Sequence, residues 1–280
     1  MPRISAPVKL LSYGDLIEKG EYKLHYRFEH AVNLRKGQAL LTILPAGRPA
    51  GPFNLVLEEL PEKVSKVVFD GKSFTINGDR VALPRGSRYE SRLAVAGIPA
   101  ARLTVNLQEL RRIVCASAPT KSAVFLLDAD REKHFRSGFE RRFVKRMKEA
   151  AVNLAMGAYE AGAAGMKGLG FGMTPSGDDF LGGYMLGINA AELYSGKNLG
   201  LVKERVYTAS LGSNLVSNAF LAASFKGRAD ERVNGVIKAL FSASGRATAK
   251  AAEELLAVGH TSGGDIAAGF LYGFYGVMNI

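Results

Sequence analysis

The sequence predicts an α+β protein, in which a β-rich, barrel-like or sandwich-like half packs on an all-helical half. Short alternating segments separated by turn-forming pairs fill residues 1–105. Apolar residues at helical spacing fill residues 106–280, and no low-complexity linker separates the two parts. The chain has 280 residues, of which 47% are hydrophobic and 22% charged. This composition is ordinary for a globular protein and supports a sizeable core.

The β-rich half is predicted from its period-two alternation and its turns. The longest candidate strand covers residues 23–33, with Leu24 and Tyr26 on one face. Asp70-Gly71 and Asn77-Gly78 are pairs that favour tight turns. Because many short strands at such spacing are typical of closed or stacked sheets, we expect a barrel or a sandwich. The other strand candidates are residues 39–44, 53–58, 66–69, 73–76, 80–83 and 91–96.

The helical half is predicted from apolar periodicity and from helix-start signals. Residues 137–161 read as one long helix, with Ser137 as its N-cap and Glu140 completing a capping box. Residues 121–128 fit a helix or a strand equally well, and a glycine-rich loop covers residues 162–175. The other predicted helices are residues 107–118, 177–193, 202–225, 231–242, 246–258 and 263–278.

The net charge of +11 is concentrated in residues 131–148, which hold eight Lys or Arg and two acids. Aromatic or apolar residues recur there at spacings of four, from Phe135 to Met147. One interpretation is an amphipathic helix with a solvated basic face. The other is a patch for nucleic acid or an acidic partner. Because no nucleic-acid module signature accompanies it, we do not expect nucleic acid as a partner.

Several features predict a cytoplasmic protein. Residues 1–11 lack the apolar run of a signal peptide. The longest uncharged stretch, residues 206–225, carries serines and asparagines, so it is not expected to span a membrane. The single cysteine, Cys115, excludes an intrachain disulfide and is expected to lie in the core.

Two segments of the helical half share one pattern when they are aligned at a serine. Residues 176–187 and residues 262–273 both read S-G-x-D-x-x-x-G-x-x-x-G. A serine followed three positions later by an acid, here Asp179 or Asp265, is typical of an N-cap with a capping box. Glycines four positions apart let another helix approach closely. On this interpretation each motif is only a well-formed start of a tightly packed helix.

A functional interpretation stays open beside the structural one. The loop before the first motif has more glycines than a helix cap requires, at positions 165, 168, 170 and 172. Glycines there permit close approach of the backbone to a ligand. Asp178 is an extra carboxylate that the cap does not need. Because the two segments share one pattern, we predict that the helix N-termini near Ser176 and Ser262 lie beside each other, where they would offer N–H groups to a small anion. Because Asp178 and Asp179 would repel a bare phosphate, Mg²⁺ or a protonated donor would have to mediate.

Two further side chains near the motifs have chemical potential. Lys167 lies in the glycine loop, where it would contact a phosphate or a carboxylate or remain solvated. His260 precedes the second serine and is a candidate for proton transfer or hydrogen bonding. The loop matches neither a P-loop nor a dinucleotide-binding fingerprint, because their required spacing and βαβ context are absent.

A polar stripe is predicted on the helix over residues 202–225. Its members are Ser210, Ser213, Asn214, Ser217 and Asn218, which share one helical face without any charge. An uncharged helix of this kind is expected to be buried. The stripe then either forms hydrogen bonds between helices or lines a ligand cavity.

The glycine loop and the first motif together read GLGFGMTPSGDDFLGG over residues 168–183, and residues 259–265 read GHTSGGD. These segments resemble the signatures of the AllH family, and Gly51-Pro52-Phe53 is similar to a shorter family element. The likeness extends from about residue 25 to 275. The named member of that family is a subunit of bacterial oxamate carbamoyltransferase, which acts with other subunits in allantoin catabolism. The resemblance implies transfer of a carbamoyl group from carbamoyl phosphate to oxamate, which gives oxalurate and phosphate.

Three functional hypotheses follow. The first is a carbamoyltransferase-type subunit that binds carbamoyl phosphate, a carboxylate or a related small anion with other enzyme subunits. The second is a Mg²⁺-dependent hydrolase of a phosphorylated or sugar substrate, and no metal ligand is assigned. The third is a non-catalytic binding or scaffold subunit. The candidate catalytic residues are Asp178, Asp179, His260 and Asp265; the candidate substrate-binding residues are Lys167, Gly170, Gly172, Thr174, Ser176, Gly177, Asn214, Asn218, Thr261, Ser262 and Gly263.

Overall fold

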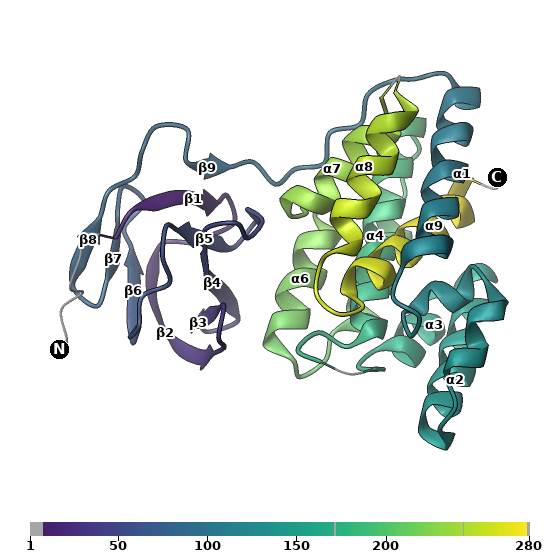
Figure 1. Cartoon of the computed structure of the whole chain (residues 1–280), viewed down its shortest axis with the longest axis horizontal. Helices are drawn as coiled ribbons and strands as arrows, with labels where there is room; N and C mark the ends of the chain where they lie inside the picture. Colours follow the sequence, from purple (N-terminus) through teal and green to yellow (C-terminus); the bar gives the residue numbers. More distant parts are fainter. Residues whose placement is uncertain (1–7, 171, 243, 279–280) are drawn as a thin grey trace. The chain divides into compact units, whose positions relative to one another are not determined.

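The computed structural model describes residues 8–170, 172–242 and 244–278. Its contacts divide the chain into two compact units, one of residues 1–92 with 229–231 and one of residues 93–228 with 232–280. The first unit is built on a β-sheet and the second on helices, so the predicted α+β class is confirmed (Figure 1). No helix in the described ranges is long and apolar enough to cross a membrane.

The β-unit is one curled sheet, which has nine strands in its described part (Figure 1). The strands lie in the order β8-β7-β6-β2-β3-β4-β5-β1-β9. Neighbouring strands are antiparallel except for the pairs β4–β5 and β1–β9, which run parallel. The strands are β1 (Leu10–Gly14), β2 (Gly20–Arg27), β3 (Val32–Lys36), β4 (Ala39–Pro45), β5 (Asn54–Leu57), β6 (Lys66–Phe69), β7 (Phe74–Ile76), β8 (Asp79–Val81) and β9 (Arg88–Tyr89).

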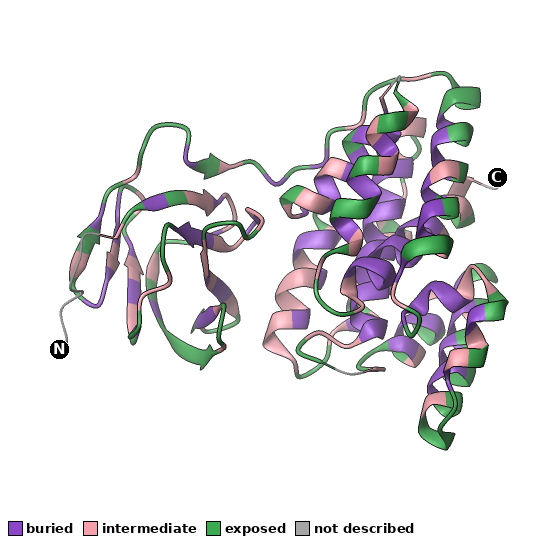
Figure 2. Ribbon diagram, in the orientation of Figure 1, coloured by how far each residue is buried: buried purple, intermediate pink, exposed green. Residues whose placement is uncertain are grey.

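The core of this unit is one cluster of buried hydrophobic side chains, and Figure 2 colours the buried positions of its strands purple. Leu34 of β3 and Leu41 and Ile43 of β4 are fully buried, and the two β4 positions are two residues apart because side chains of a strand alternate between its faces. The predicted turn at Asn77-Gly78 is confirmed. Both residues have positive φ, at 53° and 105°, and they connect β7 to β8.

Two predictions about the strands are wrong. Residues 23–33 form two strands, β2 and β3, with a turn closed by a hydrogen bond from Phe28 N to Ala31 O (2.8 Å). The alternation that suggested one strand came from exposed side chains, since Leu24 is 46% and Tyr26 57% exposed. Residues 91–96 form no strand; the Ser91 hydroxyl donates to the Asp15 carboxylate (2.6 Å), and Ser91 O accepts from Ala229 N (2.9 Å).

The helical unit contains the elements α1 (Ala100–Ser117), η1 (Ala123–Leu126), η2 (Ala129–His134), α2 (Gly138–Ala155), α3 (Tyr159–Met166), α4 (Ser176–Ser195), α5 (Gly200–Ser210), α6 (Leu215–Phe225), α7 (Glu231–Leu240), α8 (Gly245–Leu256) and α9 (Ser262–Met278). Helix α1 starts ahead of the predicted residue 107, and residues 121–128 are mainly the 3₁₀ helix η1. The capping box of Ser137 and Glu140 at the start of α2 is confirmed.

Two predicted long helices are each broken in two. Residues 137–161 divide into α2 and α3, because Gly157 takes the left-handed conformation (φ 78°) that ends a helix. Residues 202–225 divide into α5 and α6. There the Asn214 side chain accepts the N–H groups of Val216 and Ser217 and so caps a new helix. Pattern alone misses both breaks, because apolar residues keep a helical period across them.

Helices α4 and α9 run side by side and parallel through the unit (Figure 1). Every residue of α4 from Ser176 to Ala191 is buried. A Cβ at Gly183 would lie 2.1 Å from Ile266 O, and one at Gly269 would lie 2.0 Å from Phe180 O. Glycine is therefore required at both positions, and the glycines of the two motifs create the close approach of the helices.

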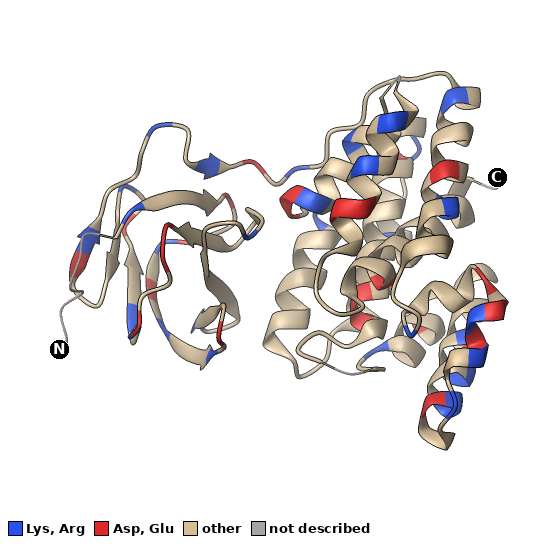
Figure 3. Cartoon of the chain, viewed as in Figure 1, with Lys and Arg blue, Asp and Glu red and all other residues tan. Residues whose placement is uncertain are grey.

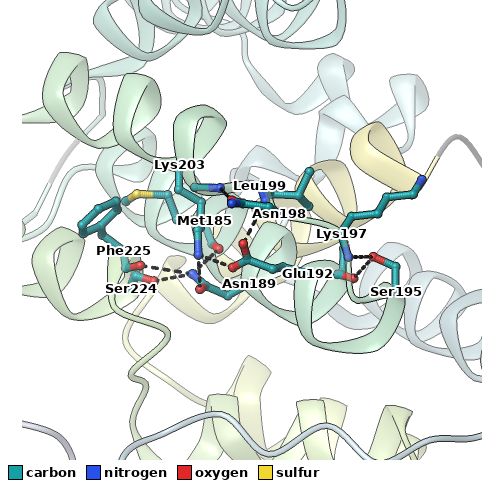
Figure 4. Close-up of polar contacts among 12 residues, drawn as sticks. Met185, Asn189, Glu192, Ser195, Lys197, Asn198, Leu199, Lys203, Ser224 and Phe225 are labelled. Carbon is teal, nitrogen blue, oxygen red and sulfur yellow. Dashed lines mark hydrogen bonds and ion pairs between the residues drawn. The ribbon is translucent and has the colours of Figure 1, made fainter.

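A polar network fixes α5 and α6 against α4 (Figure 4). The buried amide of Asn189 donates to the carbonyl oxygens of Met185 (2.9 Å) and Ser224 (3.0 Å). Its own oxygen accepts from Lys203 Nζ (3.0 Å), and Lys203 also pairs with Glu192. The network thus ties the last turn of α6 to the middle of α4.

Candidate functional site

Ser176 and Ser262 are the first residues of α4 and α9, not their caps. Pro175 has the extended conformation of a cap residue, and its carbonyl oxygen accepts from Asp178 N (2.9 Å) and Asp179 N (3.1 Å). Helix α4 has no side-chain cap, so the predicted capping box there is wrong. The backbone of Thr261 plays the same part in α9, where its carbonyl oxygen accepts from Asp265 N (3.0 Å). The side chains of both motifs are therefore available for other contacts.

Each motif brings its aspartate carboxyl close to the serine hydroxyl of the other motif. The Asp179 carboxyl interacts with the Ser262 hydroxyl and accepts from Thr174 Oγ1 (3.1 Å). The Asp265 carboxyl lies against the hydroxyls of Thr261 and Ser176. Each carboxyl thus meets the threonine of its own motif and the serine of the other. The prediction that the two helix starts lie beside each other is confirmed.

Burial dominates the electrostatics of both carboxyls. It raises the pKa of Asp179, which is 3% exposed, to about 8; the Ser262 and Thr174 hydroxyls act in the opposite direction, and the charges of Asp265 and Asp178 add to the rise. Burial likewise raises the pKa of Asp265 to about 7, although Ala123 N–H and the hydroxyls of Thr261 and Ser176 lower it. At neutral pH Asp179 is therefore mainly a neutral acid that does not repel an anion.

Asp178 organises the glycine loop. It is 4% exposed, and its Oδ1 accepts from Gly168 N (2.8 Å). Gly170 has φ 113°, and a Cβ there would lie 2.7 Å from Ser176 N. The expectation that Asp178 is an extra carboxylate without a structural duty is wrong, since the loop needs an acceptor for its inward N–H group.

The duplication extends to the helices that precede α4 and α9. Gly177 N donates to Leu169 O (2.8 Å), and Gly263 N donates to Val258 O (3.2 Å). A Cβ at Gly177 would lie 2.0 Å from Met166 O, and one at Gly263 would lie 2.1 Å from Leu255 O. Each second-position glycine therefore lets the end of α3 or α8 pack directly onto the next helix.

The 3₁₀ helix η1 covers the second motif and makes the pair asymmetric. Ala123 N donates to Asp265 Oδ1 (2.5 Å), whereas Oδ2 receives no hydrogen bond of regular geometry from the described residues. A Cβ at Gly264 would lie 3.1 Å from Ser122, so η1 occupies the place where the first motif has Asp178. Sequence reasoning missed this contribution, because residues 121–128 carried no clear pattern.

The stretch from the end of α3 to α9 holds both motifs, the glycine loop and the helices between them. Residues 166–274 match the AllH family. The family is described as oxamate carbamoyltransferase subunit AllH. The predicted resemblance is confirmed over these residues, while Gly51-Pro52-Phe53 lies outside them. No curated protein and no solved structure matches the chain.

Three predicted ligand-binding side chains of the AllH-matching stretch have partners within the protein. Lys167 Nζ donates to Leu211 O (3.1 Å). Asn214 caps α6 and donates to Met173 O (2.7 Å), which holds α6 against the glycine loop. Asn218 exchanges two hydrogen bonds with the backbone of Gly212. All three side chains thus contact the backbone of the connections around the motifs, and their predicted contacts with a substrate stay predictions.

The predicted polar stripe on a single helix is wrong. Ser210 ends α5 and is buried, Ser213 is exposed in the connection, and Asn214 and Asn218 are half-buried near the start of α6. Ser217 is buried, and its hydroxyl has no hydrogen bond with the described residues. The stripe is divided because Asn214 starts a new helix, so its members do not share one face.

The contacts within the AllH-matching stretch support neither a catalytic role for His260 nor a metal site. His260 is exposed and forms no hydrogen bond or ion pair with the described part of the chain. Among the described residues, no group of three or more His, Cys, Asp and Glu side chains is arranged to hold a metal ion. Asp178, Asp179 and Asp265 therefore do not form a ready-made Mg²⁺ site.

The basic segment over residues 131–148 lies outside the AllH-matching stretch. Figure 3 shows acidic residues interspersed with the basic ones along α2. Arg131 is 8% exposed and donates to the carbonyl oxygens of Cys115, Ala118 and Pro119. Lys148 pairs with Glu132 (2.8 Å). Part of the predicted basic face is thus structural or neutralised.

Proposed function

We propose that this chain is an AllH-type subunit of a carbamoyltransferase-type enzyme. In this proposal a small anionic carboxamide or carbamoyl substrate binds at the motif junction, defined as residues 172–179 and 259–265. The observation that carries the proposal is a pair of reciprocal contacts inside the stretch that matches the family. Asp179 lies against the serine of the second motif, and Asp265 lies against the serine of the first. Other enzyme subunits are its expected partners, because the family is described as a subunit.

The motif junction has two polar layers. Thr174, Thr261 and Ser262 are half-buried and form the outer layer, whereas Asp179 and Asp265 are buried behind them. A substrate would meet the hydroxyls first, and the carboxyls would orient those hydroxyls. The aspartates then act as positioning residues.

The donors and acceptors of the junction suit a molecule that carries an amide beside a negative group. A hydroxyl that donates to a carboxyl keeps its lone pairs, which accept an N–H group from a carboxamide. The N–H groups of Ser176 and Ser262 make no backbone hydrogen bond with the described residues, and they lie at helix N-termini, which favour anions. The neutral form of Asp179 removes the repulsion that a carboxylate or phosphate would otherwise meet.

Titration calorimetry on the full chain tests this proposal. We expect oxamate or carbamoyl phosphate to bind, and Ser262→Ala to weaken binding by about tenfold, because one hydrogen bond to the substrate is lost. Ser244→Ala is the matched control, since Ser244 lies at the start of another helix, α8, and its side chain makes no capping bond. Equal affinities of Ser262→Ala and the wild-type protein would place the substrate elsewhere.

The scaffold hypothesis remains the second candidate, because His260 does not contact the buried aspartates and leaves no assigned proton carrier. It predicts that the isolated chain binds neither substrate. Activity would then appear only when partner subunits are added, and Ser262→Ala would leave that activity unchanged.

A further inference from the structure

A cavity lies beside the middle of α4 and the C-terminal half of α9, apart from the motif junction. It has a volume of about 370 Å³, within the range of small-ligand sites. Tyr184 on its wall lies about 12 Å along α4 from Ser176, at the rise of an α-helix. Four polar side chains line the cavity, namely Arg111, Tyr184, Tyr272 and Tyr275, and the other walls are mainly apolar. Nothing in the proposed function uses this cavity.

The hydroxyl of Tyr184 is a donor without a protein partner in the described chain, on a side chain that lines this wall. Tyr184 is 2% exposed, yet its hydroxyl forms no hydrogen bond with the described residues. The hydroxyls of Tyr272 and Tyr275 likewise form none within the described ranges. Burial raises the pKa of all three phenols, so each keeps the proton that it would donate.

Arg111 supplies the only formal charge on the lining residues. Its Nη2 donates to Leu127 O (3.1 Å), and no carboxylate of the described chain pairs with it. Its positive charge acts against burial on the pKa of Tyr272 and of Tyr275, which shows that the guanidinium lies near both rings. The cavity therefore combines one cation and three hydroxyl donors without an acid.

We propose that this cavity binds a small aromatic monocarboxylate. The guanidinium of Arg111 and the phenol hydroxyls receive the carboxylate, and the apolar wall with its tyrosine rings receives the ring of the ligand. A dianion such as phosphate fits less well, because it would meet one cation and a largely apolar wall. An aromatic body suits the lining, where Tyr272 already packs on Phe180 at 5.6 Å between ring centroids.

Fluorine NMR of 4-fluorobenzoate with the full chain tests the proposal. We expect line broadening that reports a Kd near or below about 1 mM. Arg111→Met should weaken binding by at least about tenfold, because it removes the charge and keeps the stem of the side chain. Tyr184→Phe should weaken it several-fold, and it removes only an unpaired hydroxyl, so folding is preserved. Arg112→Met is the matched control, since Arg112 is the next residue of α1 and pairs with Glu109.

Two further measurements test whether binding depends on the charge of the ligand and on this cavity alone. The neutral 4-fluorobenzamide should bind at least about tenfold more weakly than the acid, because it lacks the charge that Arg111 recognises. Ser262→Ala should bind the acid as the wild-type protein does, which separates this cavity from the motif junction. Absence of broadening with the wild-type protein would overturn the proposal. So would equal affinity in Arg111→Met, or loss of binding in Ser262→Ala.

Discussion

A methyl group at Gly183 tests whether direct backbone contact between α4 and α9 sets the geometry of the motif junction. In Gly183→Ala the new Cβ would stand 2.1 Å from Ile266 O, whereas ordinary contacts begin at 3.4 Å. The two helices would have to separate by about 1.3 Å to relieve this contact. The reciprocal contact of Gly269 with Phe180 O would open at the same time, because it lies on the same pair of helices.

The expected loss of stability follows from two opposing effects. Overpacking of a rigid backbone contact costs about 3 kcal/mol, the upper part of the usual range. Alanine offsets about 1 kcal/mol of this, because it favours the helix more than glycine does. The net loss of about 2 kcal/mol corresponds to a fall in Tm of roughly 4–8 °C for a protein of this size.

Thermal melts followed by circular dichroism provide the assay, with Gly235→Ala as the matched control. Gly235 lies inside α7, and a Cβ there would meet nothing within 4 Å. The control should therefore raise Tm by about 1–4 °C through helix propensity alone. The reasoning fails if Gly183→Ala melts at or above the wild-type temperature while the control behaves as expected.

Two more predictions concern buried polar groups. Because burial raises the folded-state pKa of Asp179 to about 8, above its unfolded value, the native protein binds the extra proton and stability falls as pH rises from about 4 to about 8. Asp179→Asn should raise Tm at pH ~8 and flatten this decline in melts across the same range; an unchanged slope would count against a protonated Asp179. Asn189→Ala should lower the free energy of unfolding by about 1–3 kcal/mol in urea titrations, since the carbonyl of Ser224 loses its donor and Lys203 loses one of its two acceptors. A loss below about 0.5 kcal/mol would show that water replaces the amide.

The sequence was most informative where local pattern and packing agree. The shared S-G-x-D-x-x-x-G-x-x-x-G pattern predicted two similar helix starts side by side, and the structure adds that the glycines of each motif pack against the helix of the other. The capping box at Ser137 and Glu140 was also predicted correctly, since all of its contacts are local.

Long-range contacts could not be predicted from the pattern. A capping box at Ser176 satisfies every local rule, but Pro175 takes the cap position and the Asp179 carboxyl meets Ser262 instead. The role of Asp178 depends on how the glycine loop folds back, which no local signal records. Asn214 was predicted inside a helix because its neighbours keep a helical period, yet its side chain starts a new one.

The contacts of each aspartate with the serine of the other motif also determine when this region forms during folding. Four helices, α5 to α8, separate α4 from α9 in sequence, so the junction joins segments that are distant along the chain. Bringing distant segments together loses chain entropy before any contact compensates for it, which delays such contacts. Asp179 finds Ser262 only after α9 has docked. During synthesis, α4 therefore cannot pack on α9 until the ribosome has released α9. Until then the face of α4 that carries Gly183 and Gly187 lacks the helix on which it packs.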